Sequence, residues 1–403
     1  YSFGPHLHLD MIESATGDYV DPLPFFMEKV KDNIAPRAEG IILFPQPGKG
    51  VVNGKQIHRT FPVNPTQPIT AWGLIGAGIR AYDHMDGVGN RYGVHTVILE
   101  VDGEEVFRSV VDRFAYEENR YINSWTHGQY MKSFIEPGNR LRMLHASNGN
   151  RGLVEINEER PYRFVYTLSD ALGNTSKVRF TVQGKNTEIH PVEHREKYAF
   201  KWDRTNYLQE PGLELVVPRG MLYDDVWLDY SVRADSGDVA FTYQLHNKRV
   251  PLHGACEMRI GLRRDRLEDK SKYYVAGVTA RGGKYSIGGT YEDGFMKVRI
   301  RDLGTYTVAV DTVPPEIIPL NPGQWGRTGR ITLKAKDKET GINSYRGTID
   351  GKYALFGKPN SISGNLVCEL DPKHVKKGGR HTVEMTVTDG RGNRTTEEFH
   401  FVW

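Results

Sequence analysis

The sequence predicts a mainly β protein, organised as a multi-domain chain of Ig-like β-sandwiches. Its apolar runs are short and alternate with polar residues, as at 178–182 and 306–310, which is the period of a half-buried strand. Frequent turn signals separate these runs, with 43 Gly and 21 Pro in 403 residues. Helical patterns are sparse, and the best lie near 21–31 and 114–133. Short strands between regular turns are typical of β-sandwiches.

The composition is that of an ordinary globular protein, with 38% apolar and 26% charged residues. The net charge is only +3, and the densest basic cluster, at 259–266, is interrupted by Asp265 and followed by acidic residues. We therefore interpret that cluster as a solvated surface and expect no nucleic-acid partner. No apolar run approaches the roughly 18 residues of a membrane span, and no signal peptide is recognisable. We expect no transmembrane segment.

Two cysteines, Cys256 and Cys368, are too few to indicate a redox compartment. Because they lie far apart in the sequence, we expect two buried free thiols in different domains.

An internal repeat defines the domain map. A segment that ends in an Asp-Gly turn occurs twice, and so does a later Asp-x-x-Gly-Asn turn between two apolar strands. Each copy also begins with a proline-marked strand start. The paired segments are 93–103 with 341–351, 169–176 with 388–395, and 34–36 with 313–315. Asp-Gly is favoured in tight hairpins because both central residues adopt positive φ.

From this repeat we expect two Ig-like sandwiches at 36–188 and 312–403. The first contains an insertion near 113–160, and a β-rich middle domain without the repeat occupies 189–311.

The sharpest chemical signal is His6-Leu7-His8, flanked by apolar residues near the beginning of the sequence. On a strand, side chains at i and i+2 point to the same face, so both imidazoles could approach one zinc ion. Taken alone, such a pair is more often two strand histidines without a ligand, since a metal motif needs confirming context.

The context here is Gly-Pro-His-Leu-His at 4–8 followed by Asp10, with an Asp-Pro-Leu segment at 21–23. This arrangement resembles the last active-site strand of lysostaphin-type (LytM-like) zinc metalloendopeptidases, with Leu9 and Asp10 as departures from the usual Phe and Glu. The resemblance implies that His8 is a zinc ligand. It also implies that His6 is a catalytic histidine that orients water or stabilises the tetrahedral intermediate.

Long peptidases of this family from Bacteroidetes-like bacteria look similar over more of the chain. The similar segments are 30–36, 120–123, 133–139 and 349–352. The family takes its other zinc ligands from a His-x-x-x-Asp motif, and that motif and a further catalytic histidine would precede Tyr1. On this reading, residues 1–35 are the C-terminal remnant of the catalytic domain, poorly anchored or loosely packed on the first sandwich.

The resemblance implies a secreted, periplasmic or cell-envelope enzyme that uses Zn²⁺ to cleave peptide cross-links of peptidoglycan. This part of it would be inactive alone, because a catalytic zinc needs three protein ligands. Its β domains would position or dock the catalytic domain on peptidoglycan or on a cell-envelope protein. Two alternatives stay open. One is a non-catalytic surface adhesin or carbohydrate-binding protein, and the other is a regulator of other wall hydrolases.

Other motifs are weaker. His-x-x-Glu-His at 190–194 would need a helix to bring its histidines together, and Pro191 argues against one. Glycines at 73–78 are better interpreted as strand glycines than as a dinucleotide loop. The 83–87 segment lacks the Glu that completes a calcium loop, although a loop carboxylate cluster could bind calcium weakly. Aromatic residues at 112–134 are expected to cover the sandwich core rather than bind a glycan.

Overall fold

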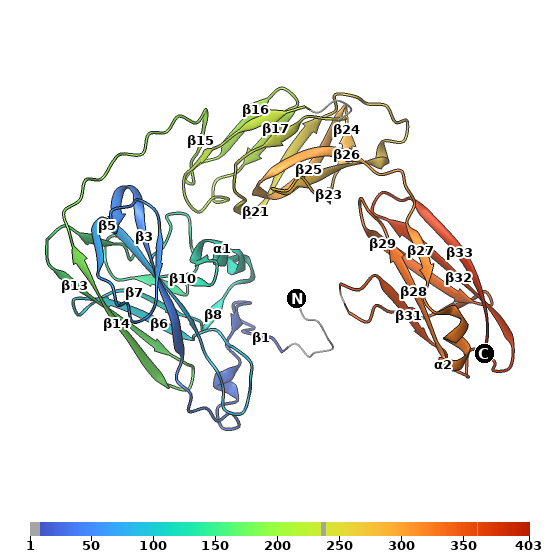
Figure 1. Cartoon of the computed structure of the whole chain (residues 1–403), viewed down its shortest axis with the longest axis horizontal. Coiled ribbons are helices and arrows are strands. Elements are labelled where there is room, and N and C mark those ends of the chain that lie inside the picture. The colour runs from blue at the N-terminus through green and yellow to red at the C-terminus, as the bar shows by residue number, and fades with distance from the viewer. Residues whose placement is uncertain (1–8, 235–238, 361) are drawn as a thin grey trace.

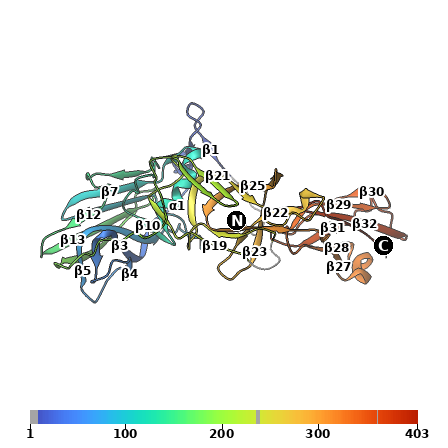
Figure 2. The ribbon, with the colours of Figure 1, turned by 90° about the horizontal axis from the view of Figure 1, so that it is seen from above.

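Three β-sandwiches follow one another along the chain in the computed structural model, which describes residues 9–234, 239–360 and 362–403 (Figures 1 and 2). Strands make up 50% of the chain and helices 6%, which confirms the predicted mainly β, multi-domain sandwich fold. Each sandwich has its own apolar core, within 38–182, 198–310 and 317–403. We call them the first, middle and last sandwich.

The first sandwich is one eleven-stranded sheet that folds over its core. The long strand β5 pairs with four other strands, β3, β10, β12 and β14. The strands are β3 Arg37–Val52, β4 Arg59–Phe61, β5 Ile69–Tyr82, β6 Thr96–Val101, β7 Glu104–Val110, β9 Thr126–His127, β10 Tyr130–Lys132, β11 Leu144–Ala146, β12 Val154–Ile156, β13 Pro161–Ser169 and β14 Thr175–Gly184.

The glycines predicted to be strand glycines lie in β5 and allow close packing. A Cβ at Gly76 would lie 2.5 Å from the Phe134 ring, and one at Gly73, where φ is +82°, would lie 2.1 Å from the Lys49 carbonyl oxygen. These contacts confirm the interpretation of 73–78 as strand rather than as a cofactor loop.

The two predicted helices are mostly absent. Only the 3-10 helix η1 (Leu23–Phe25) forms near 21–31, where two prolines at the start of the segment remove backbone donors. In the insertion, η2 (Tyr116–Tyr121) and α1 (Ile122–Trp125) end where strands β9 and β10 begin. Gly128 has a φ of +59° and allows the tight turn between those strands.

The middle sandwich packs two five-stranded sheets over a core of aliphatic and tyrosine side chains, with a short two-stranded sheet beside them. The two-stranded sheet is β15 Tyr198–Phe200 with β18 Val226–Leu228. One five-stranded sheet consists, in spatial order, of β16 Asn206–Glu210, β17 Leu213–Val217, β21 Val250–Gly261, β25 Phe295–Leu303 and β24 Thr290–Glu292. The other consists of β19 Ser231–Arg233, β20 Thr242–Gln244, β26 Thr305–Val310, β22 Tyr273–Val278 and β23 Lys284–Gly288. The 3-10 helix η3 (Lys270–Lys272) precedes β22.

The last sandwich packs a three-stranded sheet against a four-stranded sheet. The sheets are β27 Glu316–Pro319, β28 Arg330–Lys336 and β31 Asn365–Glu369, and β30 Lys352–Ala354, β29 Ile342–Ile349, β32 Arg380–Asp389 and β33 Arg394–Val402. The short helices η4 (Pro322–Gln324) and α2 (Trp325–Thr328) bring the buried Trp325 to the core. Cys256 and Cys368 are buried free thiols in the middle and last sandwiches, as predicted.

The sequence repeat is also a structural repeat. Asp102 and Asp350 both adopt positive φ, at +54° and +48°, in the Asp-Gly turns that were predicted. In the Asp-x-x-Gly-Asn turns, Asp170 Oδ1 accepts hydrogen bonds from the backbone N–H groups two and four residues later, and Asp389 Oδ1 does the same. The first and last sandwiches therefore close with the same hairpin.

The insertion in the first sandwich forms the contact with the middle sandwich. Arg120 Nη2 donates to the Leu252 carbonyl at 2.9 Å, and the Tyr223 hydroxyl donates to the Arg120 carbonyl at 2.7 Å. The Tyr121 ring stacks on His253 with ring centroids 4.0 Å apart. Gly138 N donates to the Tyr223 carbonyl at 2.7 Å. The insertion thus holds the two sandwiches together.

Gly138→Ala should weaken this contact. The added Cβ would lie 2.3 Å from the Leu222 carbonyl oxygen, so the backbones must separate. We expect a loss of about 1–3 kcal/mol of unfolding free energy, typical of overpacking, measured by urea unfolding. The control is Gly149→Ala, where a Cβ meets nothing within 4 Å. Equal stability of the two variants would contradict the assigned role of the insertion.

Candidate functional site at the N-terminal junction

The two predicted site residues, His6 and His8, lie outside the described residues. Their roles as catalytic residue and zinc ligand therefore stay predictions. The described chain begins at Leu9, directly after His8, so the structure shows how the residues that follow the motif are held. We call residues 9–36 the N-terminal segment.

The N-terminal segment adds a small sheet to the first sandwich. Strands β1 (Met11–Ile12) and β2 (Tyr19–Val20) form a hairpin, and β2 pairs with β8 (Arg113–Phe114) in the insertion. The Tyr19 and Phe114 rings stack with centroids 5.5 Å apart. The hairpin is therefore part of a three-stranded sheet with β8 and not an isolated pair of strands, which would be marginal in water.

An ion-pair network around the buried Asp18 anchors the hairpin. Asp18 is 3% exposed and accepts a bidentate pair of hydrogen bonds from the Arg142 guanidinium at 2.8 and 2.9 Å, a strong and directional arrangement. Arg113 lies 3.3 Å from the same carboxylate and also pairs with Glu13. The hydrogen bonds from Arg142 hold the pKa of Asp18 below its usual range. The expectation that this segment is poorly anchored is wrong for the hairpin, because Asp18 pairs with Arg113 and Arg142, which are distant in the sequence.

An apolar pocket of about 540 Å³ lies between the N-terminal segment and the first sandwich. One wall comes from the segment itself, including Leu9 and Met11, and the opposite wall comes from sandwich residues such as Met143 and Leu172. His95 lines it with Nε2 3.8 Å from Asp21 Oδ2. The beginning of the described chain, next to the His-x-His motif, therefore lies against this pocket.

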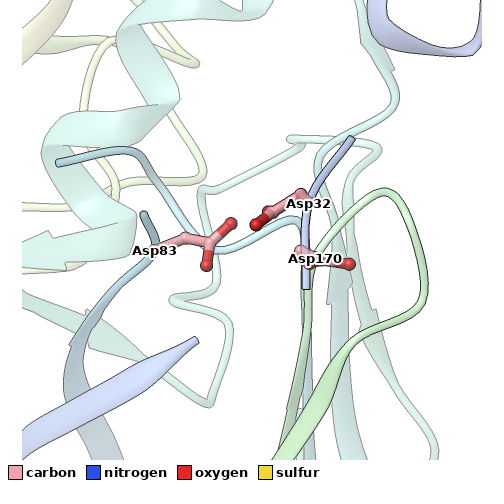
Figure 3. Close-up of side chains that lie close together, drawn as sticks. All are labelled: Asp32, Asp83 and Asp170. Atoms are coloured by element: carbon pink, nitrogen blue, oxygen red, sulfur yellow. The ribbon is translucent and has the colours of Figure 1, made fainter. Parts of the chain in front are cut away.

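Three of the residues that line the pocket are aspartates whose carboxylates lie close together. Asp32 comes from the N-terminal segment, Asp83 follows β5, and Asp170 opens the β13–β14 turn. Each offers an oxygen, and these oxygens all lie within 4.8 Å of one another. Figure 3 shows the carboxylates of Asp83 and Asp32 facing each other, with Asp170 beside Asp32.

The cluster has no cationic partner among the described residues, since none of its three aspartates forms a salt bridge there. Burial raises the pKa of Asp83 to about 6. The backbone N–H of His84 opposes this rise, and the charges of Asp170 and Asp32 add to it. Like charges disfavour one another's ionised form, so the two neighbouring carboxylates add to the effect of burial on Asp83.

A second cluster of the same kind lies at the junction between the middle and last sandwiches. It consists of Asp311, Asp337 and Asp389. Asp311 and Asp389 are each 1% exposed. The two clusters occupy equivalent places, because Asp170 and Asp389 open equivalent turns and Asp32 and Asp311 precede equivalent strand starts.

The weaker sequence motifs do not form sites. His190 and His194 lie in an extended connection without helix, and His190 is 72% exposed, which confirms that 190–194 is a linker. Trp125 and Phe134 are buried, as expected for rings that cover a core, whereas Tyr116 is 65% exposed.

The described residues do not fit a catalytic zinc site. Their two candidate metal clusters contain only carboxylates, whereas zinc sites rely on imidazole or thiolate ligands. Every helix in the described part of the chain is too short to span a bilayer.

The fold and the junctions define a multi-domain β-sandwich chain, and comparison with known families identifies one part of it. Residues 197–311, which form the middle sandwich, match the family model of the Zu5-like domain. Comparison with curated proteins gives no match.

Among solved structures, the chain is similar to the Bacteroides ovatus mixed-linkage glucan utilisation protein SGBP-B, determined with a mixed-linkage heptasaccharide. The identity is 10%, the TM-score 0.15, and the match covers 87% of this chain and 69% of that one. The human Desmocollin-1 ectodomain gives 10% identity, a TM-score of 0.17, and 89% and 71% coverage. A tetra-tandem repeat from the extending region of a large adhesion protein gives 10% identity and a TM-score of 0.19. That match covers 95% of this chain and 94% of the other. These TM-scores are too low to bear on function.

Asp18→Asn should release the N-terminal hairpin, because an amide cannot form the charge-assisted pairs with Arg142 and Arg113. We expect faster amide hydrogen exchange across Met11–Val20 and little change in the sandwich core. The control is Asp10→Asn, at an exposed position of the same segment. Unchanged exchange in Asp18→Asn would contradict the anchoring role.

The same contact predicts a pH dependence. Because the pKa of Asp18 is lowered in the folded protein, its contribution is present above its unfolded pKa of about 3.9 and is lost as the pH falls through the lower folded value. The hairpin should therefore stay protected at pH 5 and lose protection only below about pH 4. Loss of protection between pH 7 and pH 5 would contradict this assignment.

Proposed function

We propose that the chain is the C-terminal portion of a secreted zinc metalloendopeptidase that cleaves peptide cross-links in peptidoglycan. In this proposal His8 is a zinc ligand and His6 is a catalytic histidine, while the remaining ligands come from residues ahead of Tyr1. The β-sandwiches hold the catalytic domain at a set place in the cell envelope and dock it on peptidoglycan or on an envelope protein.

The observation that carries the proposal is the Gly-Pro-His-Leu-His motif joined directly to an anchored segment. The motif is the part of the sequence with the most specific resemblance. The hairpin that begins at Met11 is tied to the first sandwich by the buried Asp18 carboxylate. A catalytic strand at 4–8 would therefore be separated from a rigid support by only two residues, Leu9 and Asp10.

Rigid support has a physical consequence for such an enzyme. A flexible linker leaves the relative orientation of two domains free, whereas a paired strand and a bidentate ion pair restrict it. The insertion in turn fixes the first sandwich to the middle one. A catalytic domain attached here would therefore be oriented by the whole string of sandwiches.

The test compares the 403-residue chain with a version extended upstream through the natural gene. The extended protein should release peptides from purified peptidoglycan and should lose this activity in His8→Ala and in His6→Ala. Zinc titration should distinguish the two histidines, because His8→Ala weakens zinc binding at least tenfold and His6→Ala does not. The 403-residue chain should bind zinc no tighter than micromolar and release no peptides.

Matched controls are His190→Ala and His194→Ala, two histidines of the linker before the middle sandwich, which should leave activity and zinc binding unchanged. Equal peptide release by the short and extended proteins would reject the proposed division of the active site. An extended protein that binds peptidoglycan but neither binds zinc nor cleaves would favour a surface adhesin. One that activates a separate wall hydrolase would favour a regulator.

A further inference from the structure

We propose that Asp32, Asp83 and Asp170 form a calcium site that fastens the N-terminal segment to the first sandwich. The geometry of the oxygens permits one ion. Calcium binds oxygen at 2.3–2.6 Å, so two oxygens on opposite sides of it lie about 4.6–5.2 Å apart. The three aspartate oxygens are within 4.8 Å of one another.

Asp83 supplies an independent reason to place a ligand here. Its side chain is 6% exposed, and its Oδ1 accepts no hydrogen bond from any described residue. A buried carboxylate oxygen without a partner is costly, and such groups in proteins are usually satisfied. Figure 3 shows the carboxylate directed toward Asp32. A cation between the two would satisfy the oxygen and neutralise the cluster.

The other two aspartates retain capacity for an ion. Asp32 Oδ1 accepts from the Ile34 backbone N–H at 3.0 Å, and Asp170 Oδ1 and Oδ2 accept from the turn that follows it. A carboxylate offers about four acceptor positions, so these hydrogen bonds orient the groups without exhausting them. They present the carboxylates in fixed directions, which favours binding because less ordering is required.

The ligand set favours calcium among common metals. All three groups are hard carboxylate oxygens, which suit calcium or magnesium rather than zinc. Magnesium demands near-ideal octahedral geometry at about 2.0–2.1 Å and keeps several waters. Calcium is the larger and more adaptable ion, and three carboxylates from separate parts of the chain favour it over an ion that keeps most of its waters.

The second cluster provides a natural comparison because its aspartates already have more partners. Asp337 Oδ2 accepts three backbone N–H groups, from residues 339, 340 and 341, at 2.6–3.1 Å. Asp311 Oδ2 accepts from the Thr340 hydroxyl at 2.5 Å. Asp83, the counterpart of Asp337, lacks such a set. The proposed site is therefore the first cluster, and Asp337 is its matched control.

An ion at this place would join three separate parts of the chain, which are the N-terminal segment, the end of β5 and the β13–β14 turn. Two hydrogen bonds already connect them, from Asn174 Nδ2 to the Asp32 carbonyl at 2.9 Å and from Asn33 Nδ2 to Asp86 Oδ2 at 2.8 Å. Docking of the N-terminal segment on the first sandwich would then depend on the calcium concentration. This holds whether or not the chain belongs to a peptidase.

The test is calorimetric titration of the 403-residue chain, freed of divalent ions with a chelator, with calcium chloride. We expect saturable binding that Asp83→Asn weakens at least tenfold and Asp337→Asn leaves in place. Calcium should also raise the thermal unfolding temperature of the unsubstituted chain more than that of Asp83→Asn. Circular dichroism checks that each variant folds, and Asp32→Asn replaces Asp83→Asn if the latter does not.

Three results would overturn the proposal. The first is no calcium-dependent heat or change in unfolding temperature in the unsubstituted chain. The second is calcium binding that Asp83→Asn and Asp32→Asn leave intact, or that Asp337→Asn removes instead. The third is magnesium binding as tight as calcium binding. None of these results bears on peptide release by the extended protein, so the calcium site and the peptidase proposal are tested separately.

Discussion

The structure depends on one hydrogen-bonded turn, the Asp-x-x-Gly-Asn hairpin that closes the first and last sandwiches. In each copy the asparagine amide donates to the backbone carbonyl of an aspartate in the preceding connection, from Asn174 to Asp32 at 2.9 Å and from Asn393 to Asp311 at 3.0 Å. Two residues after each asparagine, a hydroxyl side chain donates to a proline carbonyl at the start of the sandwich. A turn that is local in sequence thereby fixes where each sandwich begins relative to what precedes it.

The same turn makes different contacts at the two junctions. In the last sandwich its third residue, Arg391, donates to the carbonyls of Tyr273 and Gly289 in the middle sandwich, both at 3.0 Å. In the first sandwich the corresponding residue is Leu172, which lines the apolar pocket facing the N-terminal segment. The last junction therefore has an added polar contact from Arg391, whereas the first has an apolar pocket and one buried carboxylate oxygen, Asp83 Oδ1, without a hydrogen-bond partner among the described residues. This difference is the reason for proposing the calcium site at the first junction.

Local patterns predicted the fold better than they predicted the site. Strand alternation and Asp-Gly turns are set by residues that are close in the sequence. The sequence therefore predicts the sandwiches and their hairpins. The Asp18–Arg142 pair joins residues 124 positions apart, in segments without periodicity, and no sequence pattern indicates it. The repeat could have paired Asp170 with Asp389, but Asp83 and Asp337 lie outside the segments that align. The 83–87 segment resembles only part of a calcium loop. The burial of Asp83 follows from the tertiary structure and not from this local pattern.

If the Asp-x-x-Gly-Asn turn fixes the domain junctions, the distance between the middle and last sandwiches should be well defined and should depend on Asn393. Spin labels at the exposed Glu257 and Lys352 positions would report on the middle and last sandwiches by pulsed electron resonance. We expect a single narrow distance distribution in the unsubstituted chain and a clearly broader one in Asn393→Ala, because the amide hydrogen bond to the Asp311 carbonyl is lost. Distributions of the same width in both proteins would contradict it.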